Sequence, residues 1–393
     1  MKIVVIIPTY NEKDNIEKTI NALEDVFKTI KKHEMHILVV DGNSPDGTAD
    51  IVRKLMQKYN NLHLIVEKKK GGLGAAYIQG MDYVFDEMEA DVAFTFDADL
   101  SHDPKVLPKF IEELEKGADQ VIGTRYTGGG SIPSDWGIHR KFLSIVGNKF
   151  ISLLYYGSGI TDFTGGYKAV RSYVYKAVRN DLDQYKGYTF AISLNLEPYR
   201  KGYKFKEIPF HFSDRTAGKS KMGAEYMFNA FIFIVKSRIE DFLKSRFGRV
   251  VIAGGIGAIS QLTSYALFHY LVEVKNIFGL AETSSIFGID IHSRFFVAQL
   301  LAIEVGIIVT FMVNNNWAFG DKKLKGFPFI VGFLKNHLVV LGAIIIQLVI
   351  AQILAAVFGI GFIRGYIYQI IGILVGLIWN FYFYKKIIWK IKK

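Results

Sequence analysis

Short apolar runs alternate with amphipathic stretches through the first 220 or so residues of the chain. The apolar runs are rich in Val, Ile and Phe and end in polar or turn residues, as buried strands do. We expect strands at 2–7, 36–41, 63–67, 92–97 and 119–124, with helices within 11–32, 48–59, 74–88 and 104–117. Strands that alternate with helices predict an α/β domain with a mostly parallel sheet wound in βαβ units.

Longer apolar runs dominate the rest of the chain. A helix that spans about 30 Å of hydrocarbon needs about 20 apolar residues. Four stretches reach this length, at 249–272, 295–319, 333–358 and 364–384. We therefore expect an all-α membrane domain of four transmembrane helices.

The segment between these parts interleaves aromatic and charged residues over 222–245. This pattern predicts one or two amphipathic helices that lie in the interface of a bilayer, the alternative being a helix packed on the first domain. The expected division is 1–221, 222–246 and 247–393.

Composition narrows the classes of partner. The chain has 393 residues, half of them hydrophobic, no cysteine and a formal net charge of +11. Disulfides and thiolate metal sites are thereby excluded. The positive charge suits anionic lipids, phosphorylated substrates or nucleic acid. Because the basic residues of the first part are spread out, nucleic acid is disfavoured and we expect no nucleic-acid partner. The first residues indicate a strand rather than a signal peptide.

The loops between the apolar stretches differ in charge. Lysines cluster in the connection 320–332 and at the C-terminus, whereas 273–294 is balanced or acidic. The positive-inside rule then predicts a multi-pass protein of the cell membrane with the first domain and both termini in the cytoplasm. Glu304, near the middle of the second stretch, invites a functional hypothesis, or it pairs with Gln299 or a polar group of another span.

The most informative motif is the pair Asp97 and Asp99, which follows a buried apolar run. On an extended segment the two carboxylates point the same way. Because close carboxylates repel each other, they need a cation or hydrogen-bond donors. Oxygen ligands that also meet substrate phosphates suit Mg²⁺ or Mn²⁺. An isolated pair of this kind is also typical of a strand end with two solvated acids.

Polar residues also follow the first two strands, at 8–12 and 41–44. Since the carboxyl ends of parallel strands share one edge of the sheet, these residues and Asp97 predict a nucleotide-type crevice. No GxGxxG follows the first strand and no GxxxxGK[ST] occurs, which argues against a dinucleotide dehydrogenase and a P-loop NTPase. The glycine-rich segment 71–76 suits a phosphate, and equally a tight turn into a helix.

The ordered motifs of the first part resemble family 2 glycosyltransferases of the A-type fold. They are PTYNE (8–12), DGNSPDGT (41–48), GGLGAAYIQG (71–80), FDADLSHDP (96–104) and GTRY (123–126). Three later motifs resemble those of dolichyl-phosphate mannosyltransferases, namely DFTGGYKAV (162–170), KGYTF (186–190) and SDRTAGKSKM (213–222). From about Phe247 the chain is similar to GtrA-like four-helix membrane domains, including FMVNNNWAF (311–319).

This resemblance implies a Rossmann-like mixed sheet and an inverting transfer of mannose from GDP-mannose to dolichyl or polyprenyl monophosphate. It also implies a divalent metal, Mg²⁺ or Mn²⁺. A phosphate acceptor is already ionised near neutral pH, so we expect electrostatic rather than general-base catalysis. The alternatives are a glucosyltransferase that uses UDP-glucose and a translocator of lipid-linked sugars with a non-catalytic first domain. A processive synthase is disfavoured because no QxxRW segment occurs.

The resemblance assigns roles to matching positions. The positions that it assigns to binding of the donor nucleoside are Pro8, Tyr10, Glu12 and Asp41. It assigns binding of the donor diphosphate to Asp97, Ala98 and Asp99. It assigns binding of the metal to Asp97, Asp99 and Ser101. Acceptor-phosphate positions are Arg125, Arg140 and Ser144. Arg125, Arg215 and Lys221 also match donor positions, and with Asp99 they form the expected catalytic set.

Several residues depart from the pattern of the family. Gly42 stands where a second acid is frequent, and Ser101 where related archaeal sequences often have Gln. Ala191 and Ser193 replace a polar residue and a Glu, so the resemblance assigns no catalytic acid there. Asp162 is either a nearby carboxylate or a helix cap or turn residue.

Overall fold

The computed structural model describes residues 1–182, 188–213, 224–286, 289–358 and 362–390. They form two compact units, Met1–Lys236 and Ser237–Lys393. The helix α8 (Ala224–Lys244) continues across this boundary. The predicted three-part division remains a prediction.

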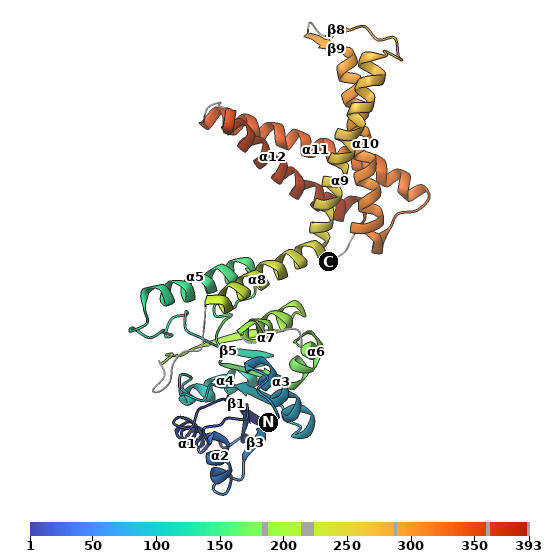
Figure 1. The fold of residues 1–393 in the computed structure, drawn as a ribbon. Helices are drawn as coiled ribbons and strands as arrows, with labels where there is room; N and C mark the ends of the chain where they lie inside the picture. Colours follow the sequence, from blue (N-terminus) through green and yellow to red (C-terminus); the bar gives the residue numbers. More distant parts are fainter. Residues whose placement is uncertain (183–187, 214–223, 287–288, 359–361, 391–393) are drawn as a thin grey trace. The chain divides into compact units, whose positions relative to one another are not determined.

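A mixed sheet is the centre of the first unit (Figure 1). Its strands in the described residues are β1 (Lys2–Thr9), β2 (Glu34–Asp41), β3 (Leu62–Val66), β4 (Val92–Thr95), β5 (Gln120–Thr124), β6 (Lys168–Arg171) and β7 (Phe205–Pro209). Their order is β3-β2-β1-β4-β6-β5-β7. The five strands expected from the sequence are confirmed, whereas β6 and β7 were not expected. Strand β6 is antiparallel to both its neighbours, so the sheet is mixed.

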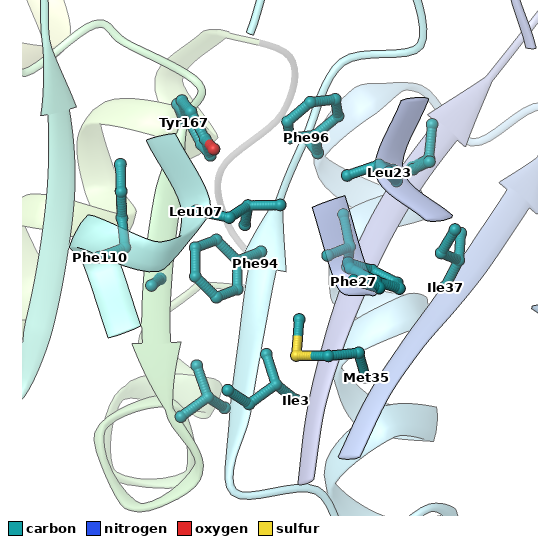
Figure 2. Close-up of a cluster of buried hydrophobic side chains, with 14 of the residues drawn as sticks. Ile3, Leu23, Phe27, Met35, Ile37, Phe94, Phe96, Leu107, Phe110 and Tyr167 are labelled. Atoms are coloured by element: carbon teal, nitrogen blue, oxygen red, sulfur yellow. The ribbon is translucent and has the colours of Figure 1, made fainter. Parts of the chain in front are cut away.

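Helices cover both faces of this sheet, and the unit contains seven described α-helices before α8. They are α1 (Ile16–Phe27), α2 (Thr48–Met56), α3 (Leu73–Asp82), α4 (Leu107–Glu115), α5 (Ile138–Leu154), α6 (Ser172–Leu182) and α7 (Tyr188–Arg200). Because successive strand residues point to opposite faces, Ile3 and Val5 pack with α1 and α4 while Val4 and Ile6 pack with α3 and α6. Figure 2 shows the first of these clusters, with Phe94 and Phe110 among its buried rings.

The second unit contains long helices. They are α9 (Arg246–Phe268), α10 (Ser293–Val313), α11 (Phe327–Phe358) and α12 (Phe362–Phe383), with a hairpin of β8 (Thr283–Ile286) and β9 (Ile289–His292) before α10. By length and composition, two described helical segments suffice to cross a membrane, Arg246–Val272 and Leu301–Ala318. Short 3₁₀ or π segments lie at Tyr83–Glu87, Pro104–Val106, His269–Val274, Asn314–Ala318, Gly320–Lys322 and Tyr384–Ile388.

Small residues allow close helix packing in this unit. A Cβ atom on Gly257 of α9 would lie only 2.8 Å from the carbonyl oxygen of Gly306 in α10. Glycines of this kind let helix backbones approach each other in a membrane. Gly257 ends a glycine-rich stretch, 254–257, within α9.

Two polar contacts tie the helices of the second unit together. His337 Nε2 of α11 lies 3.0 Å from Glu304 Oε1 of α10, so the partner of Glu304 is a polar group of another helix. In the FMVNNNWAF segment, Asn315 Oδ1 accepts hydrogen bonds from Leu324 N–H at 2.8 Å and Trp389 Nε1–H at 3.0 Å. Asn315 thus fixes the α10–α11 connection to the C-terminal segment.

Candidate functional site

The carboxyl ends of β3, β2, β1 and β4 lie side by side at one edge of the sheet. Backbone hydrogen bonds continue past the strand ends, from Glu67 N–H to Asp41 O at 2.8 Å and from Gly42 N–H to Thr9 O at 2.9 Å. Polar residues that follow these strands are therefore held in register. This is the edge at which open α/β sheets bind ligands.

The two aspartates of the DxD motif lie in a turn. Strand β4 ends at Thr95, and Leu100 has a left-handed backbone with φ of 58°. The expectation that both aspartates share one extended segment is therefore wrong. Asp99 is buried and accepts a hydrogen bond from Ser101 N–H at 3.1 Å, whereas the Asp97 side chain is 34% exposed. The turn brings Asp97 to the surface and keeps Asp99 beneath it.

His102 supports this turn, and no sequence pattern predicted it. Its Nδ1 accepts a hydrogen bond from Asp97 N–H at 3.1 Å, so its proton is on Nε2, which lies 3.5 Å from Asp97 Oδ2. The ring stacks on Tyr167 with centroids 4.9 Å apart. Burial lowers the pKa of His102 to about 3, so the imidazole is neutral at physiological pH.

The residues predicted to bind metal offer hard oxygen ligands. Ser101 Oγ is buried and makes no hydrogen bond to the described part of the chain. A buried hydroxyl without a partner is costly, and a cation beside it satisfies its lone pairs. No group of three or more His, Cys, Asp or Glu in the described residues is placed to hold a metal. The carboxylates of Asp97 and Asp99 and the hydroxyl of Ser101 are hard oxygen ligands of the kind that Mg²⁺ and Mn²⁺ take.

Arg125 is held by a buried carboxylate from another part of the chain. Its Nε and Nη2 donate to Asp162 Oδ2 and Oδ1, each at 2.7 Å, and Nη2 also donates to Thr164 Oγ1 at 2.9 Å. Burial alone would raise the pKa of Asp162, but attraction to Arg125 and its hydrogen bonds outweigh burial and lower that pKa. Asp162 is thus a carboxylate partner of Arg125 and holds the guanidinium in one orientation.

The other predicted acceptor positions lie on or near α5. Ser144 Oγ is 2.6 Å from Tyr126 Oη, and the Arg140 guanidinium carbon lies 3.7 Å from the Trp136 ring centroid. Asn148 of the same helix donates to Thr164 Oγ1 at 2.8 Å. One hydrogen-bonded chain therefore joins α5 to the loop that positions Arg125.

Lys168 is a second buried cation near this loop, and sequence reasoning missed it. It lies on β6, and its Nζ donates to the carbonyl oxygen of Gly165. Burial lowers its pKa to about 8, against the opposing attraction of Asp162. The sequence around Lys168 contains no pattern that distinguishes a buried lysine in a short strand from a lysine on the surface.

The predicted nucleoside positions surround the ends of β1 and β2. Pro8 lies in β1, and Glu12 accepts a hydrogen bond from Asn15 Nδ2 at 2.9 Å. Asp41 is fully buried and accepts from Thr9 Oγ1 at 2.7 Å, Ser44 N–H at 2.8 Å and Ser44 Oγ at 2.7 Å. Its carboxylate therefore orders the loop after β2.

Tyr10 has a cation over its ring, since Lys70 Nζ lies 3.4 Å from the ring centroid. Ala98 is buried, and its carbonyl accepts from Thr19 Oγ1 at 2.6 Å. Ser193 in α7 is buried and donates to Thr189 O at 2.7 Å. The predicted Arg215 and Lys221 lie outside the described residues.

Comparisons with known proteins match both parts of the chain. A model described as "Glycosyl transferase family 2" matches residues 4–179, and one described as "GtrA/DPMS, transmembrane domain" matches residues 249–389. A mixed sheet with an acidic turn after β4, in a chain that both models match, defines a membrane-bound glycosyltransferase.

Curated relatives agree with that class. The chain is 34% identical over 236 residues to an undecaprenyl-phosphate mannosyltransferase of Micrococcus luteus, which covers 60% of this chain and 93% of the relative. It is 29% identical over 358 residues to a dolichol-phosphate mannosyltransferase of Pyrococcus furiosus, with 90% of this chain and 91% of the relative covered. The chain belongs to glycosyltransferase family 2, in the family of these polyprenyl-phosphate mannosyltransferases.

A solved structure with a similar fold is glucosyl-3-phosphoglycerate synthase from Mycobacterium tuberculosis in complex with Mn²⁺, UDP and glucosyl-3-phosphoglycerate. Its TM-score is 0.46 at 16% identity, over 60% of this chain and 79% of that one.

Proposed function

We propose that the protein transfers mannose from GDP-mannose to a polyprenyl monophosphate, with inversion at the anomeric carbon. The observation that carries this proposal is that the chain combines an acidic turn, Asp97–Ser101, with the fixed guanidinium of Arg125. Burial would lower the pKa of the Arg125 guanidinium, but attraction to Asp162 and, more weakly, to Asp97 raises it. Anionic metal ligands beside an immobilised arginine suit a reaction between two phosphate-bearing substrates.

The chain supplies orientation and charge to this reaction. Asp97, Asp99 and Ser101 would hold Mg²⁺ or Mn²⁺, which neutralises charge on the leaving diphosphate when bound. Arg125, held by Asp162, would offer a phosphate a guanidinium of fixed orientation, which Lys does not provide. Because the acceptor oxygen is already ionised, its alignment with the sugar is the main catalytic task.

Helix α5 supports a lipid-linked acceptor. Ile138 and Phe142, four residues apart on the same helix face, are 87% and 62% exposed. Exposed aliphatic and aromatic side chains at this density are unusual on a water-facing helix. We propose that this face lies in the bilayer surface while Arg140 and Ser144 receive the acceptor phosphate. The sequence had indicated interfacial helices only at 222–245.

We further propose that α9–α12 each cross the membrane and that both termini and the catalytic unit face the cytoplasm. The lysines of the α10–α11 connection, Lys322, Lys323 and Lys325, support this topology. It places the donor site in the compartment that supplies nucleotide sugars.

Labelled donors with a short polyprenyl phosphate test the proposal. Membranes that contain the protein should form lipid-linked mannose from GDP-mannose, and the Asp99→Ala variant should lose this activity at equal expression. Lipid-linked glucose from UDP-glucose, without any mannose product, would establish the alternative donor. Undiminished turnover by Asp99→Ala would contradict the proposed role of the acidic turn.

A further inference from the structure

Glu67 is a buried carboxylate to which no role has been assigned. It lies where the carboxyl ends of β3, β2, β1 and β4 meet, which we call the nucleotide edge. It follows β3 directly and is only 8% exposed. Within the described residues it accepts one hydrogen bond, from Gly71 N–H at the long distance of 3.4 Å. A buried carboxylate normally has better partners, so Glu67 retains acceptor capacity for a ligand.

The Glu67 carboxylate and the Tyr10 ring both approach Gly42, the first residue after β2. A Cβ atom on Gly42 would lie 3.3 Å from Glu67 Oε2 and 3.3 Å from Tyr10 Cδ2. The carboxylate and the tyrosine ring therefore flank the same position. Any side chain on residue 42 would crowd the carboxylate and the ring, whereas glycine allows both to lie this close.

Asp41 is a poorer acceptor for a ligand at this edge. Its buried carboxylate already receives three hydrogen bonds, from the Thr9 hydroxyl and from both the backbone and the hydroxyl of Ser44. A ligand donor would have to compete with these contacts. Glu67, with one weak contact, has no such competition from the described residues.

The position of Glu67 along the edge suits the base end of a donor nucleotide. Strand β3 is three places from β4 in the sheet, which is about 14 Å at a spacing of about 4.8 Å per strand. A nucleoside diphosphate spans a comparable length. With its diphosphate at Asp97 and Asp99, its base would lie near Tyr10 and Glu67.

Building on the proposed function, we propose that Glu67 selects guanine as the donor base. Guanine presents two adjacent donors, N1–H and the exocyclic amino group, which match the two oxygens of a carboxylate. Uracil presents a single N–H between two carbonyl oxygens, which a carboxylate repels. A site built for two hydrogen bonds discriminates strongly against a base that cannot form them. The Lys70 ammonium lies over the Tyr10 ring. A bound base would stack on the same ring in its place.

Nucleotide binding by the full chain in detergent tests this assignment. The probes are GDP, IDP and UDP, measured by calorimetric titration, because IDP lacks only the exocyclic amino group. We expect the wild-type protein to bind GDP roughly tenfold tighter than IDP. Glu67→Gln should weaken GDP binding roughly 10- to 100-fold and bring the GDP-to-IDP ratio toward one. Glu17→Gln, at an exposed carboxylate of α1, should change neither value.

The outcomes separate the inference from the function on which it rests. Equal wild-type affinity for GDP and IDP, or an unchanged ratio in Glu67→Gln, would overturn the role of Glu67 and leave GDP-mannose as the donor. Tighter binding of UDP than of GDP would overturn both. If the variant does not fold, equal wild-type affinity for GDP and IDP still overturns the role of Glu67, and a wild-type preference for GDP supports it.

Discussion

The Asp162→Asn substitution tests how the catalytic unit holds Arg125. The native carboxylate receives Arg125 Nε and Nη2 at 2.7 Å, Arg125 N–H at 3.2 Å and Gly165 N–H at 2.9 Å. An amide replaces one acceptor by a donor that faces these N–H groups, and it leaves the guanidinium charge without a counterion. Breaking a buried pair in this way costs about 3–5 kcal/mol.

This cost is large enough to measure by scanning calorimetry of the full chain in detergent. At about 2–4 °C per kcal/mol for a unit of this size, the midpoint of the transition should fall by roughly 6–20 °C. Lipid-linked sugar formation should also fall. The double variant Arg125→Met/Asp162→Leu should lose the activity too. It should not return to wild-type stability, because Leu leaves the N–H groups of Arg125 and Gly165 without an acceptor.

The pH dependence of the same variant gives a second readout. The folded-state pKa of Asp162 lies below the unfolded value, so the pair contributes stability above pH about 4. This contribution is lost as pH falls through the folded-state pKa, and the difference between wild type and Asp162→Asn should shrink there. A midpoint change below about 2 °C with full activity would refute the reasoning.

Three further substitutions address other parts of the site. Burial lowers the pKa of Lys168 to about 8, so unfolding takes up a proton between about pH 8 and 10. The stability of the wild-type protein should therefore rise with pH in this range. The Lys168→Met variant, followed by calorimetry, should not show this rise. Asn at position 102 reproduces the His Nδ1 acceptor, and Gln reproduces the Nε2 donor toward Asp97. We expect His102→Asn to weaken Mn²⁺ binding severalfold more than His102→Gln does, when binding is measured by electron paramagnetic resonance in the presence of GDP. Equal binding by the two variants would contradict the role of His102 in orienting Asp97. Phe142→Ser should raise the KM for polyprenyl phosphate severalfold without changing that for the donor, whereas Met56→Ser on α2 should change neither; an unchanged acceptor KM would remove α5 from lipid contact.

The alternation of apolar runs and helical stretches was sufficient to predict β1–β5 and the edge at which the site lies. Strand β6 was missed because KAVR is short and its lysine is polar, although the strand is buried between β4 and β5. Its polar side chain is buried because Gly165 O and the neighbouring Asp162 compensate the charge. Local pattern alone carries no information about such compensation.

The chemistry of the acidic motif was predicted better than its geometry. Asp97 and Asp99 were expected on an extended segment, but the Ser101 backbone and the His102 ring fold them into a turn. The pairing of Arg125 with Asp162 joins positions 37 residues apart. Contacts of this range depend on the sheet order, which the sequence pattern does not specify.

The stereochemistry of the product tests the central claim most directly. Purified full-length protein, GDP-mannose, Mn²⁺ or Mg²⁺ and a short polyprenyl phosphate would be combined, and the lipid product would be examined by mass spectrometry and NMR spectroscopy. The account predicts a polyprenyl-phosphate-mannose whose anomeric configuration is opposite to that of the donor. A product that retains the donor configuration, or no lipid-linked mannose from folded protein, would contradict it.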